Sequence, residues 1–137
     1  PERDGIVAGL YFLDLMARED KTPSELVQML FAKLGREYHY HRHDLRFPAG
    51  QRQAIEDRVV AWKPTEIDGS KVLHRNELDG FKYHLDDDSW LLIRFSGTEP
   101  LLRVYCETTT AERVTTLLRI GREAAGVELP TEGSADG

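Results

Sequence analysis

The sequence predicts an α+β fold, in which an antiparallel sheet of four to five strands carries helices on one face and a helix from a preceding domain comes before it. Two observations carry this prediction. The strand-like segments in the second half of the chain follow one another with only short turns, which favours antiparallel pairing. The helical segments have one apolar face each, as packing on a sheet requires, except the first, which is apolar on every face.

Composition limits the function classes that fit this chain. Its 137 residues, 40% of them hydrophobic, suffice for one compact domain or one domain plus a piece of another. Lysine and arginine total 18 against 24 acidic residues, and this net charge of −6 opposes general binding to nucleic acid or to an anionic membrane. The single cysteine, Cys106, cannot support a disulfide framework, which favours a reducing, cytoplasmic setting.

The first helix is predicted over Ile6 to Ala17, with Asp4 as its N-cap. Its apolar side chains lie on all sides, so it has to be buried all round. It could be the central core helix of this domain, but an N-terminal segment seldom occupies the centre of so small a domain. We therefore expect residues 1–20 to be the terminal helix of a preceding domain, in a chain that starts at Pro1 as a piece of a longer protein. The apolar stretch is too short to span a membrane.

Residues 21–127 are expected to form a second domain, followed by a flexible tail over 128–137. Its first helix begins at Thr22-Pro23-Ser24-Glu25, which combines an N-cap, a proline at the first helical position and a capping-box glutamate. A leucine stripe at helical spacing then runs as far as Gly35 and predicts that this helix packs on the sheet.

Changes in the spacing of apolar side chains predict the next two elements. Alternating side chains from Tyr38 to Phe47 predict a strand. A helix is expected from Pro48 to Trp62, where Lys63-Pro64 ends it.

Two short strands are expected next, Lys71 to Arg75 and Phe81 to Leu85, joined by a turn-rich segment. The last helix is expected to start at Thr109, with Glu112 completing a second capping box, and to end at Gly126.

Residues 91–107 read LLIRFSGTEPLLRVYCE, two apolar runs that predict a β-hairpin. When both apolar faces are placed on the same side, Phe95 lies opposite Leu102 and Arg94 lies opposite Arg103. Two like charges that face each other across a hairpin are unfavourable unless a negative group lies between or beside them.

The loop of this hairpin has the chemistry to hold a negative group. Ser96 and Thr98 carry hydroxyls, Gly97 lets its backbone N–H approach a ligand closely, and a guanidinium can donate to two oxygens of one phosphate. The alternative is that Glu99 and Glu107 neutralise the arginines, and that the loop residues are simply those that turns favour. The full string is more specific than its parts, and it favours a phosphate clamp.

The string Arg94-Phe95-Ser96-Gly97-Thr98-Glu99-Pro100, followed by Arg103 and Tyr105, resembles the phosphate-binding loop in the C-terminal domain of the α-D-phosphohexomutases. That family includes phosphoglucomutases, phosphomannomutases and phosphoglucosamine mutases. Residues 1–7 are similar to the start of the last helix of the family's third domain, and Asp79-Gly80-Phe81-Lys82 is similar to its turn before the loop. The resemblance covers residues 1–126.

The resemblance implies a TATA-binding-protein-like domain that holds the non-reacting phosphate of a hexose phosphate, while phosphoryl transfer between the 1- and 6-positions takes place elsewhere. By matching positions, Arg94, Ser96, Gly97 and Thr98 would be phosphate ligands and Arg103 would support them. Glu99 and Pro100 would shape the loop.

The resemblance also implies the remaining parts of the full-length enzyme. It would be an isomerase with Mg²⁺ bound outside this fragment and glucose 1,6-bisphosphate as intermediate or activator. Its partners would be the hexose phosphate and its own first three domains, with no nucleic acid and no membrane. The phosphoserine, metal and sugar-reading loops of the family belong to the earlier domains, so the fragment alone is expected to be inactive. Phe95 and the tyrosine-rich strand slightly favour phosphoglucomutase/phosphomannomutase over phosphoglucosamine mutase.

Two other patterns suggest different functions. His39, His41 and His43 share a strand face and could approach one zinc ion, but this face continues into apolar residues, which favours a packed or solvated strand. Tyrosines and arginines on the opposite face could stack on bases, as in a nucleic-acid-binding module on a similar sheet. The acidic net charge opposes that second alternative.

Overall fold

The computed structural model describes residues 4–128, and the chain divides into two compact units, Pro1–Glu37 and Tyr38–Gly137. The first unit contains α1 (Gly5–Glu19) and α2 (Pro23–Leu34), and the second contains the sheet with the remaining helices. A domain boundary after residue 20 stays a prediction. The expected tail over 128–137 lies outside the described residues, apart from Glu128.

Both helices of the first unit begin at the expected caps. A carboxylate oxygen of Asp4 accepts hydrogen bonds from the first N–H groups of α1, at 3.0 Å. At the start of α2, the Thr22 N–H donates to Glu25 at 2.8 Å and the Glu25 N–H donates back to the Thr22 hydroxyl at 3.4 Å, which completes the capping box. No side chain of α1 is buried within this chain. The expectation that another domain covers this helix stays a prediction. Packing of α2 on the sheet also stays a prediction.

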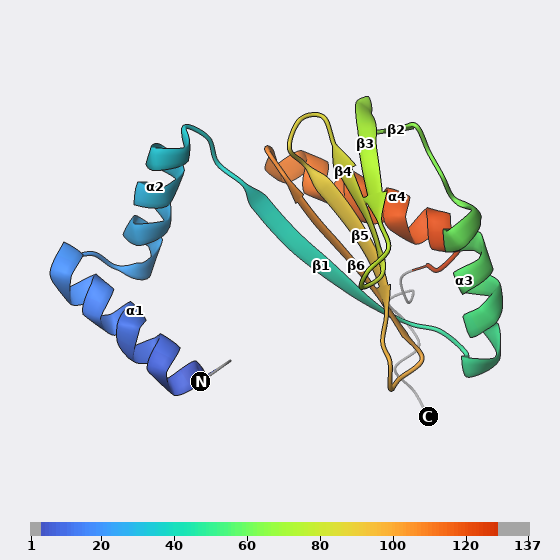
Figure 1. Ribbon diagram of the computed structural model, residues 1–137, viewed down its shortest axis with the longest axis horizontal. Coiled ribbons are helices and arrows are strands. Elements are labelled where there is room, and N and C mark those ends of the chain that lie inside the picture. The colour runs from blue at the N-terminus through green and yellow to red at the C-terminus, as the bar shows by residue number, and fades with distance from the viewer. Residues whose placement is uncertain (1–3, 129–137) are drawn as a thin grey trace. The chain divides into compact units, whose positions relative to one another are not determined.

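The second unit is built on a six-stranded sheet with the order β1-β6-β5-β4-β3-β2, in which all neighbouring strands are antiparallel (Figure 1). The strands are β1 (His39–Arg46), β2 (Glu66–Ile67), β3 (Ser70–Asn76), β4 (Phe81–Leu85), β5 (Trp90–Phe95) and β6 (Leu101–Thr108). The α+β class is therefore confirmed, and the count of four to five strands was low. With only two residues, β2 is too short to show an alternating pattern.

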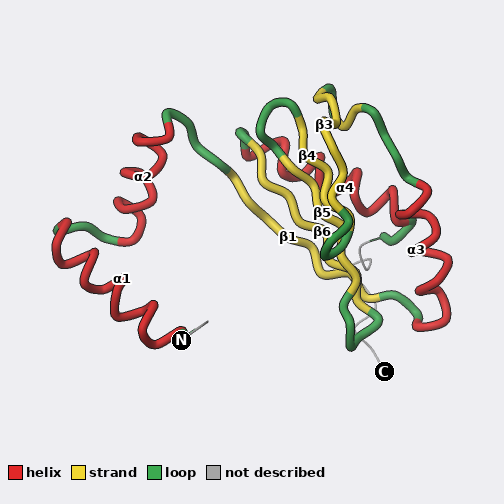
Figure 2. Tube along the Cα trace, in the orientation of Figure 1, coloured by secondary structure: helices red, strands yellow, loops and turns green. Residues whose placement is uncertain are grey.

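The helices α3 (Arg52–Ala61) and α4 (Ala111–Ala125) lie on one side of these strands, as Figure 2 shows. A short 3₁₀ turn, Ala49–Gln51, precedes α3. Across the sheet, α4 packs on β6, β1 and β5, and α3 packs against α4. None of the helices between residues 4 and 128 combines the length and hydrophobicity needed to cross a bilayer.

The start of α4 differs from the prediction by one residue. Its N-cap is Thr110, not Thr109, and the Thr110 hydroxyl accepts from the N–H of Arg113 at 3.4 Å. Because Thr108 still pairs with His39 in the sheet, the chain needs a further residue before it can enter the helix. The expected capping box with Glu112 is therefore wrong, while the end of α4 at Gly126 is confirmed.

The core lies between the sheet and α4. Leu91 and Ile93 of β5 and Val104 and Cys106 of β6 are fully buried there. At Gly121 of α4, an added Cβ would lie 2.6 Å from a Val104 methyl, so the helix backbone rests directly on the sheet. Burial raises the pKa of the Cys106 thiol to about 11, which keeps it protonated and unreactive at neutral pH.

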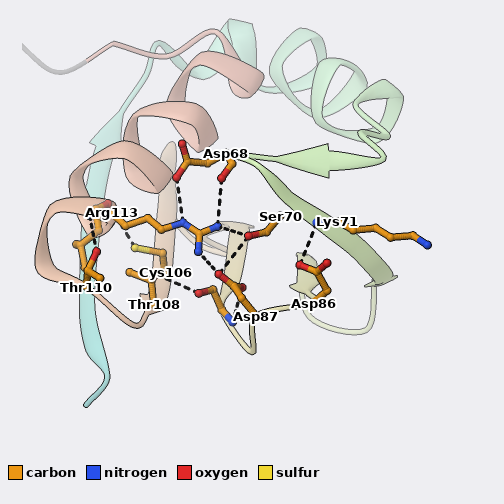
Figure 3. Close-up of polar contacts among 11 residues, drawn as sticks. Asp68, Ser70, Lys71, Asp86, Asp87, Cys106, Thr108, Thr110 and Arg113 are labelled. Atoms are coloured by element: carbon orange, nitrogen blue, oxygen red, sulfur yellow. Dashed lines mark hydrogen bonds and ion pairs between the residues drawn. The ribbon is translucent and has the colours of Figure 1, made fainter. Parts of the chain in front are cut away.

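A polar network ties α4 to the end of the sheet that lies away from the hairpin loop (Figure 3). The Arg113 guanidinium, 16% exposed, donates to Asp68 at 2.9 Å, to the Ser70 hydroxyl at 2.7 Å and to Asp87. Ser70 in turn donates to Asp87 at 3.1 Å. One side chain therefore holds two turns and the start of β3 in place, which gives this network a structural role.

Neutralising Asp87 should destabilise the domain. Partial burial acts to raise the pKa of this carboxyl, but hydrogen bonds and charge from Arg113, with the Ser89 N–H, outweigh it and leave the pKa below its ordinary value. The stabilisation is therefore fully present above the ordinary pKa of about 4, and it is lost as pH falls through the lower folded-state pKa.

We expect Asp87→Asn to lower the free energy of unfolding by about 1–2 kcal/mol at pH 7, as measured by urea unfolding. The matched control is Asp86→Asn, in the same turn, whose retained oxygen still accepts from Lys71. Equal stability of Asp87→Asn and wild type at pH 7 would contradict the expected role.

Candidate functional site

Two arginines face each other at the end of the β5–β6 hairpin. Arg94 of β5 and Arg103 of β6 are direct partners in the register, as are Phe95 and Leu102, so both expected pairings are confirmed. Directly opposed residues project to the same face, and this is the face that α3 and α4 leave open. The two side chains therefore leave the sheet on its open face next to the loop, Arg94 toward Asp79 in the turn before β4 and Arg103 toward Asp44 of β1.

The ion pairs of these arginines leave donors available. Arg94, 41% exposed, contacts Asp79 through Nε at 3.0 Å. Arg103 approaches Asp44 only to 3.9 Å, and its buried Nε has no hydrogen-bond partner. Within residues 4–128, neither Glu99 nor Glu107 forms an ion pair with Arg94 or Arg103, which contact Asp79 and Asp44 instead. Glu107 accepts a hydrogen bond from Trp90 at 3.1 Å.

The loop joining the strands has backbone hydrogen bonds at its ends but few in its middle. The Ser96 N–H donates to Leu101 O and the Leu101 N–H donates to Glu99 O, both at 2.8 Å. The Thr98 N–H reaches the Ser96 hydroxyl only at 3.5 Å, a long and weak bond. Among residues 4–128, the N–H groups of Gly97 and Glu99 have no hydrogen bond to the protein. The loop thus presents consecutive weakly held or unpaired N–H groups beside the arginines, a backbone arrangement suited to an anion.

Two glycines near the site differ in their backbone conformation and in the space around their Cα atoms. Gly80, in the turn before β4, has a φ of +94°, and an added Cβ would lie 2.7 Å from the Ile93 carbonyl oxygen and 3.0 Å from the Arg94 Cβ. Its absent side chain lets the turn pack against the base of Arg94. Gly97 has no left-handed φ, and an added Cβ would meet nothing within 4 Å. The fold itself therefore does not demand glycine at position 97, whereas close approach of a ligand would.

A third arginine, Arg52 at the start of α3, contacts the loop from the helix side. Its Nη1 donates to the Ser96 carbonyl at 2.9 Å, and its guanidinium lies 5.6 Å from the centre of the Phe95 ring. No local pattern predicts this contact, because Arg52 and Ser96 are 44 positions apart along the chain. Asp79 and Asp44 were likewise not expected as partners of the arginines.

The surroundings of Arg94 set a condition on any ligand. A pocket of about 250 Å³ beside it is lined by Glu56, Glu77 and Asp79 as well as by Arg94 itself. An anion must therefore displace the Asp79 carboxylate from the guanidinium or share it. Both groups are well exposed, so this ion pair is weak and its exchange costs little.

The three histidines of β1 are not grouped as a metal site would require in the described structure. His41 and His43 meet edge to face with ring centres 5.9 Å apart. Burial, with smaller contributions from Arg122 and His41, lowers the pKa of His43, as is expected for a ring packed against the α4 side of the sheet. Within the described part of the chain, no three histidine, cysteine or acidic side chains are grouped as a metal would require.

Residues 51–120 match the family model described as phosphoglucomutase/phosphomannomutase, C-terminal domain. This range includes the arginine pair, the loop and the turn at Gly80. The chain belongs to this family. The expected resemblance to the C-terminal domain of the phosphohexomutases is therefore confirmed.

Named relatives agree with the family. A phosphoglucomutase/phosphomannomutase from Thermococcus kodakarensis is 31% identical over 87% of this chain and 24% of its own length. A phosphoglucosamine mutase from Methanococcus aeolicus is 34% identical over 76% of this chain and 21% of its own length. A crystal structure of a phosphoglucomutase/phosphomannomutase family protein from Burkholderia thailandensis aligns with a TM-score of 0.48 and 21% identity, over 69% of this chain and 19% of that one. The chain spans about a quarter of the length of the curated relatives that it matches.

Proposed function

We propose that this chain is the phosphate-holding C-terminal domain of a phosphohexomutase of the phosphoglucomutase/phosphomannomutase type. It holds the non-reacting phosphate of a hexose phosphate through Arg94, Ser96, Gly97 and Thr98, with Arg103 in support. The observation that carries the proposal is the pairing of Arg94 with Arg103 on one face, beside a loop whose Gly97 N–H has no acceptor among residues 4–128.

Holding a phosphate that does not react still contributes to turnover. Binding energy from a remote group can position the reacting end of the substrate and help to close the site against water. An Arg pair with nearby N–H groups suits this task, because guanidinium forks and backbone donors recognise phosphate oxygens without touching the sugar. The domain would therefore accept the phosphate at either end of the hexose.

The remaining chemistry belongs to other parts of the intact enzyme. From the family resemblance, we assign Mg²⁺ and the phosphoserine chemistry to the preceding domains, with glucose 1,6-bisphosphate as the intermediate. The intact enzyme would be cytoplasmic, with neither a nucleic acid nor a membrane as partner. This chain by itself would not catalyse phosphoryl transfer.

A ligand titration tests the proposal. Backbone amide shifts of this chain should be followed during addition of glucose 6-phosphate, glucose 1-phosphate or free glucose. Both phosphates should move the amides of residues 94–98 with similar, weak affinity, because the site recognises the phosphate and not the sugar. Free glucose should leave these amides unchanged.

Other outcomes of this titration would contradict the proposal. Equal responses to free glucose and to its phosphates, or phosphate shifts confined to another part of the chain, would refute the assignment. A single-stranded oligonucleotide that binds the open sheet face more tightly than the hexose phosphates, and in a salt-dependent way, would support the nucleic-acid alternative.

Phosphoglucosamine mutase remains the alternative within the family. Relatives with that name match this chain as well as those named phosphoglucomutase/phosphomannomutase do. The proposed site contacts the phosphate that both substrate classes share. Kinetics of the intact enzyme with glucosamine 6-phosphate and glucose 6-phosphate distinguish the two.

A further inference from the structure

We propose that Arg52 is a positioning residue that fixes the Ser96–Gly97 peptide so that the Gly97 N–H points at the bound phosphate. The inference rests on the proposed function, because it concerns the same loop. It adds a residue that lies outside the hairpin and does not itself need to touch the ligand.

Arg52 is placed firmly against the loop. Its guanidinium donates to the Ser96 carbonyl at 2.9 Å and lies over Phe95, whose ring packs on Phe47 at 6.2 Å between centres. Next to this contact, the Phe47 N–H donates to Pro100 O at 3.2 Å. The start of α3 and the base of the loop therefore form one connected unit.

Peptide geometry turns this contact into a constraint on the neighbouring donor. The peptide bond is planar and trans, so the C=O of Ser96 and the N–H of Gly97 point in opposite directions. Arg52 holds the C=O toward α3, on the helix side of the hairpin. The Gly97 N–H is consequently directed away from α3, toward the side from which Arg94 and Arg103 project.

No other described contact fixes this peptide. The remaining bonds of the loop join Ser96 with Leu101, Leu101 with Glu99 and, at a long 3.5 Å, the Thr98 N–H with the Ser96 hydroxyl, and none of them involves the C=O of Ser96 or the N–H of Gly97. Without Arg52, the plane could rotate and turn the Ser96 carbonyl toward the phosphate. The site would then lose a donor and gain a repelling oxygen.

The test is a titration of this chain with inorganic phosphate, comparing wild type with Arg52→Met, Arg52→Lys and Arg58→Met. Arg58 lies on the same helix and forms neither a hydrogen bond nor an ion pair with the loop among the described contacts, so it is the matched control. We expect Arg52→Met to weaken phosphate binding about tenfold, as loss of one donor to a charged ligand predicts. Arg52→Lys retains a donor for the carbonyl and should recover most of the affinity. Arg58→Met should bind like wild type.

Two readouts separate positioning from a general effect of charge. The Gly97 amide should shift strongly on phosphate addition in wild type, and hardly at all in Arg52→Met, while the Arg94 Nε–H still responds. The loss should also persist at about 0.5 M salt, where screening removes long-range charge effects. Combining Arg52→Met with Gly97→Ala should weaken binding no further than Gly97→Ala alone, because both changes act through one N–H.

Arg94→Ala distinguishes the two ways of failing. If Arg94→Ala abolishes binding while Arg52→Met binds phosphate like wild type with an unchanged Gly97 response, the role of Arg52 is wrong and the proposed function stands. A loss in Arg52→Met that disappears in salt also overturns positioning. If Arg94→Ala has no effect either, the phosphate site itself is refuted.

Discussion

Replacing Arg94 with alanine should weaken the binding of glucose 6-phosphate about 30-fold, equivalent to about 2 kcal/mol. Arg94 is the more exposed arginine of the pair, so its guanidinium is better placed to donate to two oxygens of a phosphate. Its partner in the free protein, Asp79, is more exposed still, so little folding energy is lost with the pair. Ser96→Ala should also weaken binding, by less, since it removes one neutral hydroxyl.

The effect of Arg94→Ala should appear in the intact enzyme as a loss in kcat/KM without loss of folded protein. Arg119→Ala is the matched control, because Arg119 also forms an exposed ion pair, with Glu123 on α4 at 2.9 Å, but lies away from the loop. Arg94→Ala and Arg119→Ala with equal kcat/KM would contradict the assignment of Arg94 as a phosphate ligand.

Replacing Gly80 with alanine should destabilise the domain by about 3 kcal/mol or more. The φ of +94° is costly for any residue with a side chain, and the added Cβ would stand 2.7 Å from a backbone oxygen of β5, which cannot move without shifting the strand. The same collision involves the Cβ of Arg94, so phosphate binding should fall as well. Urea unfolding followed by the fluorescence of Trp62 and Trp90, both in the sheet-containing unit, measures the loss.

Gly97→Ala is the matched comparison, because the chemical change is identical. Gly97 has an ordinary φ and open space around its Cα, so stability should stay the same or rise by a few tenths of a kcal/mol. Phosphate binding should nevertheless weaken, since the new methyl would lie beside the N–H that we propose as a phosphate donor. If Gly80→Ala is as stable as Gly97→Ala, the steric account of the turn is wrong.

Elements defined by local chemistry could be predicted from the sequence. Thr22 and Glu25 satisfy each other's donors within one helical turn, so four residues suffice to place the start of α2. The register of the β5–β6 hairpin followed from alternation, because a slip by one residue would expose the whole apolar face. The short strand β2 lacks such a pattern, and the choice between Thr109 and Thr110 as the cap depended on how far β6 stays paired with β1.

The candidate site divides in the same way. Arg94, Arg103 and the loop are local to one hairpin, so their proximity could be read from the sequence. Arg52 reaches Ser96 from a distant helix, and Asp79 and Asp44 reach the arginines from neighbouring strands or turns. These contacts are set by how α3 and the strands pack, and no residue spacing records them. Sequence reasoning therefore predicted the residues that we propose as phosphate ligands, and it missed the residues that contact them from elsewhere in the fold.

A crystal structure of this chain with bound glucose 6-phosphate tests the central claim most directly. The phosphate should lie on the open face of the sheet, within hydrogen-bond distance of the Arg94 guanidinium and of the Gly97 N–H, with Asp79 displaced from Arg94 and Arg52 still bound to the Ser96 carbonyl. A phosphate bound elsewhere on the described surface, with Arg94 still paired to Asp79 and the Gly97 N–H facing solvent, would contradict the claim.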